Sequence, residues 1–509
     1  MPLSCIAASA TSTTAGKGRQ LWLRFGQSGR PCRLVCAGLR HPPAGFVAST
    51  GACARSYRTA APVGGDTRSG DGGSPIRKVW LACSPLERKQ LLTICISSAV
   101  TNLGFGVVIP ALPALARELG FGASGVGLLL AVPGLAKLVA NLPAGMLSDH
   151  VGRVPCMVAG ASVATVGVLG TGLFGSLALI LPVRGLGGMG MAVASASSAA
   201  YLVDLTERLH LRPFRGLIVG AQGGLISAAY VLGPAIGGAL TQAHSAQVAY
   251  AFVATLTAGC AALYATLPET VVVAASGRTM AAGAPGKDGG GVVAWLRVWG
   301  GLARGAAEGW RGLLQERNQQ GLLIGNCMLY LNYAANITVI PMQAFQNFGT
   351  TPGEIGLLYS AASVVGVVMS PVAGRFADRY GRLALVAPAT IAAAMGCLGV
   401  AFLSEWSHFV AAYMLWSLGT SMLSPALNAY AADIAPKENT GSALALSRQA
   451  QDLVFFLAPP SLGLLLDVHP GPAAMACTAG VTMLGGLLFR LRAREVVGGC
   501  LKEDSTSKR

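Results

Sequence analysis

Two short charged turns carry the residues whose types and spacing most suggest chemistry. The first contains Asp149, Gly152 and Arg153, between two long apolar runs. Asp149 ends the first run, and a carboxylate at the C-terminal end of a helix is unfavourable unless a cation partners it. The same arrangement returns, in register, in the second half of the chain. The matching residues are Gly145 and Gly374, Asp149 and Asp378, Gly152 and Gly381, and Arg153 and Arg382.

Polar residues within the apolar runs form a second set of candidates. Burying them in lipid is costly, so each predicts either a hydrogen bond to a neighbouring helix or a place on a solute pathway. Lys137 favours the pathway because it is a central cation with no acid in its own run. It shares a helical stripe with Asn141, Ala144 and Ser148, so we expect it to face a cavity. The other candidates for contact with substrate or protons are Asn102, Asn141, Gln222, Asn332, Asn336, Gln451 and Asp452.

Asp452 is the acid that lies furthest inside an apolar run, and a titratable group at such depth can take up and release a proton. Its neighbour Arg448 lies one turn away, so an ion pair within one helix is the alternative interpretation. Lys137 and Arg184 contribute two cations against this one acid. That balance favours an anionic or neutral substrate over a polycation.

The composition indicates which elements position these residues. Of 509 residues, 53% are hydrophobic and 11% are charged, whereas a soluble domain has about 25% charged residues. Several apolar runs exceed the roughly 20 residues that cross a bilayer as a helix. The runs are continuous, which argues against the alternating strands of a membrane barrel. The sequence therefore predicts an all-α, polytopic membrane protein.

We predict twelve membrane-spanning helices in two groups of six. Short loops within each group make neighbouring helices antiparallel. The first group spans residues 89–115, 124–147, 155–175, 177–203, 214–242 and 246–267, and the second spans residues 320–346, 354–376, 383–403, 408–433, 441–467 and 472–491.

The net charge of +16 is typical of proteins that bind nucleic acid or anionic lipid, but the distribution of the charge argues against such a binding face. Basic residues concentrate in alternate loops and near both termini, whereas the opposite loops carry Arg117 alone. By the positive-inside rule, the basic loops face the side from which the chain inserts. We expect a lipid bilayer as the surroundings and no nucleic-acid partner.

The sequence does not have the residue patterns of disulfide-bonded or metal-binding proteins, membrane enzymes or ATP-driven pumps. The twelve cysteines are scattered, so we expect neither a disulfide framework nor a metal site. The six histidines are scattered as well, which argues against a membrane enzyme, and we expect no catalytic residues and no cofactor. The P-loop pattern for ATP is absent from the sequence.

The chain divides into five predicted segments. Residues 1–78 are rich in Arg and Ser and poor in acids, as in an organelle transit peptide, although a disordered cytosolic tail is the alternative. Residues 79–270 and 320–495 form the two bundles. Between them, residues 271–319 include a basic amphipathic stretch, 292–314, that predicts a helix on the membrane surface or a plain linker. Residues 496–509 are a tail.

The repeated turn resembles the signature loop of the major facilitator superfamily, and the resemblance covers roughly residues 85–495. Further motifs of that family follow in order, with an antiporter-like Gly-Pro motif in the fifth span. This chain has Ala229 where that motif has another glycine, and the second half is more degenerate. The matching residues are Arg184, Gly188 and Gly190 in the fourth span, and Gly220, Gly233, Pro234, Gly237 and Gly238 in the fifth.

The resemblance implies roles for these residues. It implies that Asp149 pairs with Arg153 and with the start of the eleventh span near Thr440, and so latches one conformation. The alternative is that the charges only anchor loops in water. It also implies that the first half carries more of the coupling chemistry, although Asn102 stands where many proton-coupled relatives have a carboxylate.

On this resemblance we expect a secondary transporter of a small organic solute, similar to drug or metabolite:proton antiporters. Two six-helix bundles rock about a central site so that each side has access in turn. The alternative is an organic-anion facilitator that is uncoupled or works by symport. A further alternative is a sensor that has the transporter fold but does not transport. We expect a monomer in a chloroplast, mitochondrial or other cellular membrane.

Overall fold

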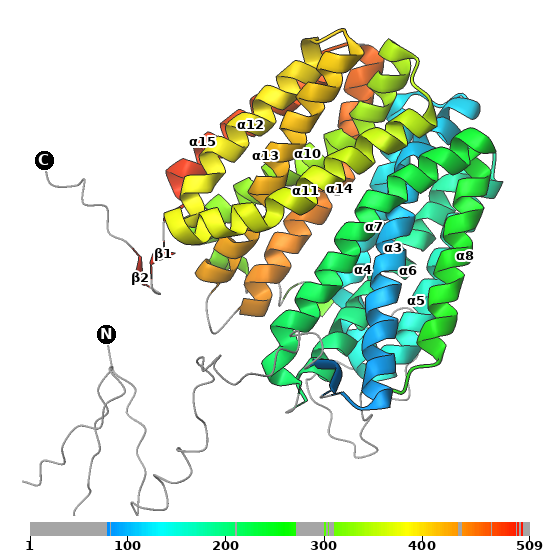
Figure 1. Ribbon diagram of the computed structural model, residues 1–509, viewed down its shortest axis with the longest axis vertical. Coiled ribbons are helices and arrows are strands. Elements are labelled where there is room, and N and C mark those ends of the chain that lie inside the picture. The colour runs from blue at the N-terminus through cyan, green and yellow to red at the C-terminus, as the bar shows by residue number, and fades with distance from the viewer. Residues whose placement is uncertain are drawn as a thin grey trace, which may run out of the picture. The chain divides into compact units, whose positions relative to one another are not determined.

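The computed structural model describes residues 79–81, 83–208, 211–270, 300–301, 304, 310–435, 440–469, 471–494, 496–497 and 500–501. These residues contain twelve long α-helices (Figure 1). The first bundle consists of α3 (Pro85–Glu118), α4 (Ala123–Val151), α5 (Arg153–Leu173), α6 (Leu177–Thr206), α7 (Arg215–Ala243) and α8 (Ala246–Ala265), with the 3-10 turn η1 (Arg212–Phe214) before α7. The second consists of α10 (Arg317–Phe348), α11 (Pro352–Tyr380), α12 (Arg382–Phe402), α13 (Trp406–Ile434), α14 (Thr440–Val468) and α15 (Ala473–Arg492). A short antiparallel hairpin follows, with two residues in each strand: β1 (Val496–Val497) and β2 (Cys500–Leu501).

The predicted fold class is confirmed, and each helix begins and ends within a few residues of its predicted span. Within the described residues, eleven helices are long and apolar enough to cross a membrane. The twelfth long helix, α13, is not among these eleven. Residues 1–78 and most of residues 271–319, with the predicted leader and surface helix, lie outside the described residues.

The charged turns are sharp because a glycine breaks the helix in each. Gly152 separates α4 from α5 with φ 114°, and Gly381 separates α11 from α12 with φ 97°. Side chains other than glycine rarely adopt a positive φ of this size. The next residue in each turn, Arg153 or Arg382, is therefore the first residue of a new helix and lies beside the acid that ends the previous one.

The two bundles meet through small residues at one end. A Cβ added at Gly127 of α4 would lie 2.4 Å from the Pro459 carbonyl of α14, and one added at Gly238 of α7 would lie 2.5 Å from the Pro352 carbonyl of α11. We call this the closed end. The other end, which carries both charged turns, is the basic end.

At the basic end the same helices face open space. A Cβ added at Gly145 of α4, at Gly220 or Gly224 of α7, or at Gly374 of α11 would meet no atom within 4 Å. The hydrophobic core shows the same division. One cluster of buried residues draws on both bundles, whereas the clusters nearer the basic end belong to one bundle each. The bundles are therefore packed together at the closed end and separated at the basic end.

Candidate functional site

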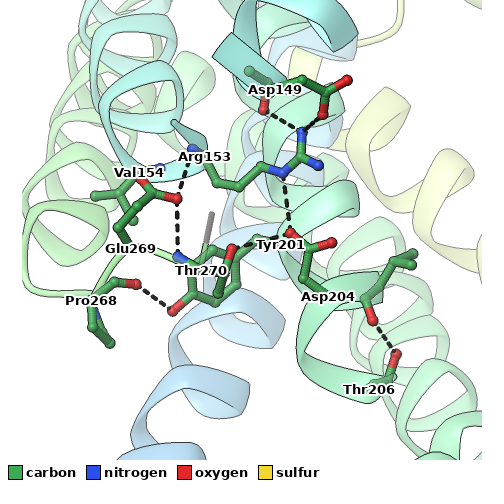
Figure 2. Close-up of polar contacts among 11 residues, drawn as sticks. Asp149, Arg153, Val154, Tyr201, Asp204, Thr206, Pro268, Glu269 and Thr270 are labelled. Atoms are coloured by element: carbon green, nitrogen blue, oxygen red, sulfur yellow. Dashed lines mark hydrogen bonds and ion pairs between the residues drawn. The ribbon is translucent and has the colours of Figure 1, made fainter. Parts of the chain in front are cut away.

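The first charged turn forms an ion-pair network around Arg153 (Figure 2). The Arg153 guanidinium lies 2.5 Å from the Asp149 carboxylate and 3.2 Å from the Asp204 carboxylate of α6. It also donates a hydrogen bond to the Ser148 hydroxyl at 3.0 Å. The Arg153 side chain is only 12% exposed, whereas that of Asp149 is 59% exposed. One arginine thus joins α4, α5 and α6.

Glu269, just after α8, completes this network. Its carboxylate accepts hydrogen bonds from the backbone N–H groups of Arg153 and Val154, both at 2.9 Å, and so caps the start of α5. A Cβ added at Gly152 would lie 2.7 Å from this carboxylate. Figure 2 also shows the Tyr201 hydroxyl of α6 donating to the Pro268 carbonyl at 2.9 Å. The segment after α8 is therefore fixed to the turn between α4 and α5.

The second turn repeats the pattern. Arg382 pairs with Asp378 and, at 3.1 Å, with Asp433 of α13. The Tyr430 hydroxyl of α13 donates to the Arg494 carbonyl at 3.3 Å, as Tyr201 does to Pro268 in the first half. Asp149 and Asp378 each lie beside the arginine that begins the next helix, the pairing that the resemblance implies for Asp149.

The predicted latch between Asp149 and the start of α14 falls on residues 440–442, whose side chains lie outside the described part of the chain. Gly145 and Gly374 line the open space at the basic end, so their small size is not required by packing in this conformation. Contact across the bundles at this end therefore stays a proposal for the opposite conformation.

The motif residues of α6 and α7 lie at helix crossings. Arg184 donates a hydrogen bond to the Leu129 carbonyl of α4. A Cβ at Gly188 would lie 2.7 Å from Pro133 of α4, and one at Gly190 would lie 2.5 Å from the Gly160 carbonyl of α5. These residues allow α6 to approach both neighbours closely.

The Gly-Pro motif of α7 packs on two sides. On one side, Gly233 meets Gly106 and Gly237 meets Val107, both on α3. On the other, Gly238 and the Pro234 carbonyl meet Gly356 of α11. The motif therefore joins both bundles at the closed end, whereas Gly220 faces the open space at the basic end.

A cavity of about 130 Å³ lies within the first bundle. Apolar side chains from α3, α4, α5, α6 and α8 form most of its wall, and Ile337 of α10 contributes from the second bundle. Among the described residues that line it, the charged ones are Lys137 and Arg184. The structure therefore places Lys137 at a cavity, together with the second predicted cation.

Asp452 of α14 reaches across to the first bundle. Its carboxylate accepts a 2.6 Å hydrogen bond from the Asn141 side-chain amide of α4. Arg448, one turn before Asp452, contributes to the charge around this carboxylate, but the ion pairs within 4 Å among the described residues do not include one between the two. The nearby Gln451 amide instead donates to the Asn326 side chain of α10 at 3.3 Å.

The remaining polar candidates lie apart from this cavity. Asn332 is fully buried; it accepts from the Trp416 indole at 2.7 Å and donates to the Thr482 hydroxyl at 2.9 Å, so we assign it to helix packing. Asn336 accepts from the Tyr413 hydroxyl. In the first bundle, the Tyr230 hydroxyl donates to Asn102 at 2.9 Å, and the Gln222 amide donates to the Ser98 hydroxyl at 2.8 Å.

Asp467, near the end of α14, also joins the bundles. Its carboxylate accepts from the backbone N–H groups of Ala123 and Ser124, both at 2.8 Å, at the start of α4. A carboxylate at a helix N-terminus is favourable because it satisfies free donors and opposes the helix dipole. We expect Asp467→Ala to lower the stability of the closed end by about 1 kcal/mol. Hydrogen–deuterium exchange of the Ala123 and Ser124 amides should then be faster, and unchanged exchange would contradict this role.

Comparison with known proteins adds the family context. The family model described as Major Facilitator Superfamily matches residues 94–315 and 322–505. Multidrug resistance protein 1 of Bacillus subtilis is 30% identical over 162 residues, which are 31% of this chain and 41% of that protein. Quinolone resistance protein NorA of Staphylococcus aureus is 21% identical over 403 residues, 78% of this chain and 95% of that protein. The fold is also similar to the crystal structure of the human organic anion transporter MFSD10. The superposition covers 80% of this chain and 100% of the MFSD10 chain, with a TM-score of 0.54 and 18% identity.

Proposed function

Since the chain belongs to the Major Facilitator Superfamily, we propose that its solute is a small organic anion with an apolar body. The family places the chain among integral multi-pass membrane proteins that carry small solutes by secondary transport, and not among enzymes.

The cavity beside Lys137 carries the proposal. Its wall is mostly apolar, and its charged members among the described residues are the two cations Lys137 and Arg184. A cation within a membrane is costly, so an anion beside the two cations of the cavity wall is favoured. A solute with one negative charge and an apolar remainder supplies both the counter-ion and the apolar contact.

The arrangement of the helices supports alternating access to this site. The bundles are packed at the closed end and separated at the basic end. A rocking motion that reverses these two ends gives the site access to the other side. The ion pairs around Arg153 and Arg382 lie at the end that has to close.

We expect Lys137→Ala to raise the KM for anion uptake about tenfold or more, because a hydrogen bond to a charged group contributes about 1.5–3 kcal/mol. Lys137→Arg keeps the cation and is the matched control. The KM of both variants is measured from the uptake of a panel of labelled organic anions and cations into proteoliposomes. Full uptake by Lys137→Ala, with the same preference between anions and cations, would remove the basis of the proposal.

We propose protons as the coupling ion, because Asp452 places a carboxylate between the bundles. Exchange of the solute for a proton is the antiport mode, and binding of both together is the symport mode. An uncoupled facilitator is the second candidate, favoured by the absence of an acid among the described residues of the cavity wall. Uptake with an imposed pH gradient of either direction separates these modes. Antiport gives faster uptake when the lumen is acidic, symport gives the reverse, and an uncoupled facilitator responds to neither.

The cellular membrane and the oligomeric state are also proposals. The Arg- and Ser-rich composition of residues 1–78 favours an organelle membrane, and the two-bundle fold favours a monomer. A fluorescent fusion that keeps residues 1–78 tests the first, because a signal at another membrane contradicts it. The mass of the purified protein in a lipid nanodisc tests the second.

A further inference from the structure

The contact between Asn141 and Asp452 is unusual among the contacts that join the two bundles. In the part of the chain that the structure describes, three hydrogen bonds cross between them. The Asp467 carboxylate accepts two of them at the closed end. The third joins Asn141 of α4 to Asp452 of α14 well inside both helices. A charged group at this depth indicates a function beyond packing.

Lys137 lies close to this contact and also to the cavity. It is one helical turn before Asn141 on α4, so the two side chains project from the same face. The Lys137 ammonium and the Asp452 carboxylate are near enough to interact electrostatically. Lys137 also lines the cavity of the first bundle. One cation is therefore shared between an acid of the other bundle and the space proposed for the solute.

Among the groups around Asp452, Lys137 is the cation that can contact both the Asp452 carboxylate and an anion in the cavity. Arg448 lies one turn before Asp452 on α14, and the phenol of Tyr330 approaches from α10. Arg448 is exposed and is not among the residues that line the cavity. Asn141 donates a hydrogen bond to Asp452 but carries no charge.

We infer that Asp452 and the substrate anion compete for Lys137, so that Asp452 sets the affinity and the pH dependence of anion binding. This inference rests on the proposed transport of an anion. In the empty protein, Lys137 and Asn141 stabilise the Asp452 carboxylate. A bound anion takes the ammonium, and the carboxylate then loses its counter-ion across the bundles. Protonation of Asp452 relieves this loss and makes room for the anion at Lys137, so the anion and the proton bind together, as in the symport mode.

The sign of the pH dependence follows from this competition. When the pH falls, Asp452 gains a proton and becomes neutral, whereas Lys137 stays positive. The anion then binds without a competitor, so its affinity rises as the pH falls. An anion that keeps its charge throughout, such as an arylsulfonate, makes the change attributable to the protein.

The experiment measures binding of a panel of arylsulfonates to the full-length protein in nanodiscs between pH 5 and pH 8. We expect the wild-type Kd to fall about tenfold toward low pH, because removing one charge–charge interaction of about 1.4 kcal/mol changes the affinity by that factor. Asp452→Asn should bind with the low-pH affinity at every pH. Asp452→Glu keeps a carboxylate and should retain the pH dependence.

The outcomes separate this inference from the proposed function. If no arylsulfonate binds in a way that depends on Lys137, the proposed function fails and the inference fails with it. If binding depends on Lys137 but Asp452→Asn keeps the wild-type pH dependence, the inference alone is wrong. A purely structural role predicts weaker binding by Asp452→Asn at every pH, which also overturns the inference. Thermal unfolding of each variant confirms that it is folded before binding is compared.

Discussion

Arg153→Gln should abolish most transport and lower the free energy of unfolding by about 2 kcal/mol, between the cost of breaking a buried ion pair and that of losing a surface one. The substitution leaves the Asp149 and Asp204 carboxylates without the cation that joins them. Breaking a fully buried ion pair costs about 3–5 kcal/mol. The effect here is smaller because Asp149 is 59% exposed and water screens part of the loss. Thermal unfolding in detergent measures the stability, and uptake into proteoliposomes measures transport.

Arg382→Gln is the matched control in the second half. Arg382 is 27% exposed, and its partners Asp378 and Asp433 are 68% and 37% exposed. Among the described residues, no carboxylate caps the start of α12 as Glu269 caps α5. We therefore expect a loss of only about 1 kcal/mol, as for a surface ion pair. Equal losses in the two variants would contradict the unequal roles of the two turns.

The sequence repeat extends beyond the two turns to other residues of the two ion-pair networks. Asp433 follows Asp204 by the same interval that separates Arg382 from Arg153, and Tyr430 follows Tyr201 by that interval as well. Extending the repeat beyond the turns would have identified these residues as members of both networks. Asp204 and Asp433 lie near the ends of α6 and α13, outside the turns, so the repeated turn alone does not identify them.

Other parts of the site depend on spatial relations that the repeat does not encode. Glu269 has no acidic counterpart at the same interval, where the chain has Gly498, and its position depends on how the chain turns after α8. The hydrogen bond from Asn141 to Asp452 depends on how the two bundles meet. Periodicity gives the face of each helix and therefore predicted that Lys137 lines a cavity. It cannot give the partner helix or the end at which the bundles separate.

The glycines of α4 allow a second strong prediction about the two ends of the molecule. Gly127 lies against the backbone of Pro459 and Pro460 at the closed end, and an added Cβ would be 2.4 Å from the Pro459 carbonyl. Backbone cannot yield as a flexible side chain can, so Gly127→Val should disfavour this conformation. We expect uptake to fall at least tenfold. Hydrogen–deuterium exchange should increase in residues 122–130 and 459–467.

Gly145→Val is the same substitution on the same helix, placed at the basic end. An added Cβ there meets no atom within 4 Å, so the present conformation should tolerate it. Closing the basic end requires α4 to approach the second bundle, and a larger side chain obstructs that approach. We therefore expect uptake to fall as in Gly127→Val, but with exchange at the closed end as slow as in the wild type. If Gly145→Val transports normally, the basic end closes without contact at this position, and Gly145 has no part in the proposed latch.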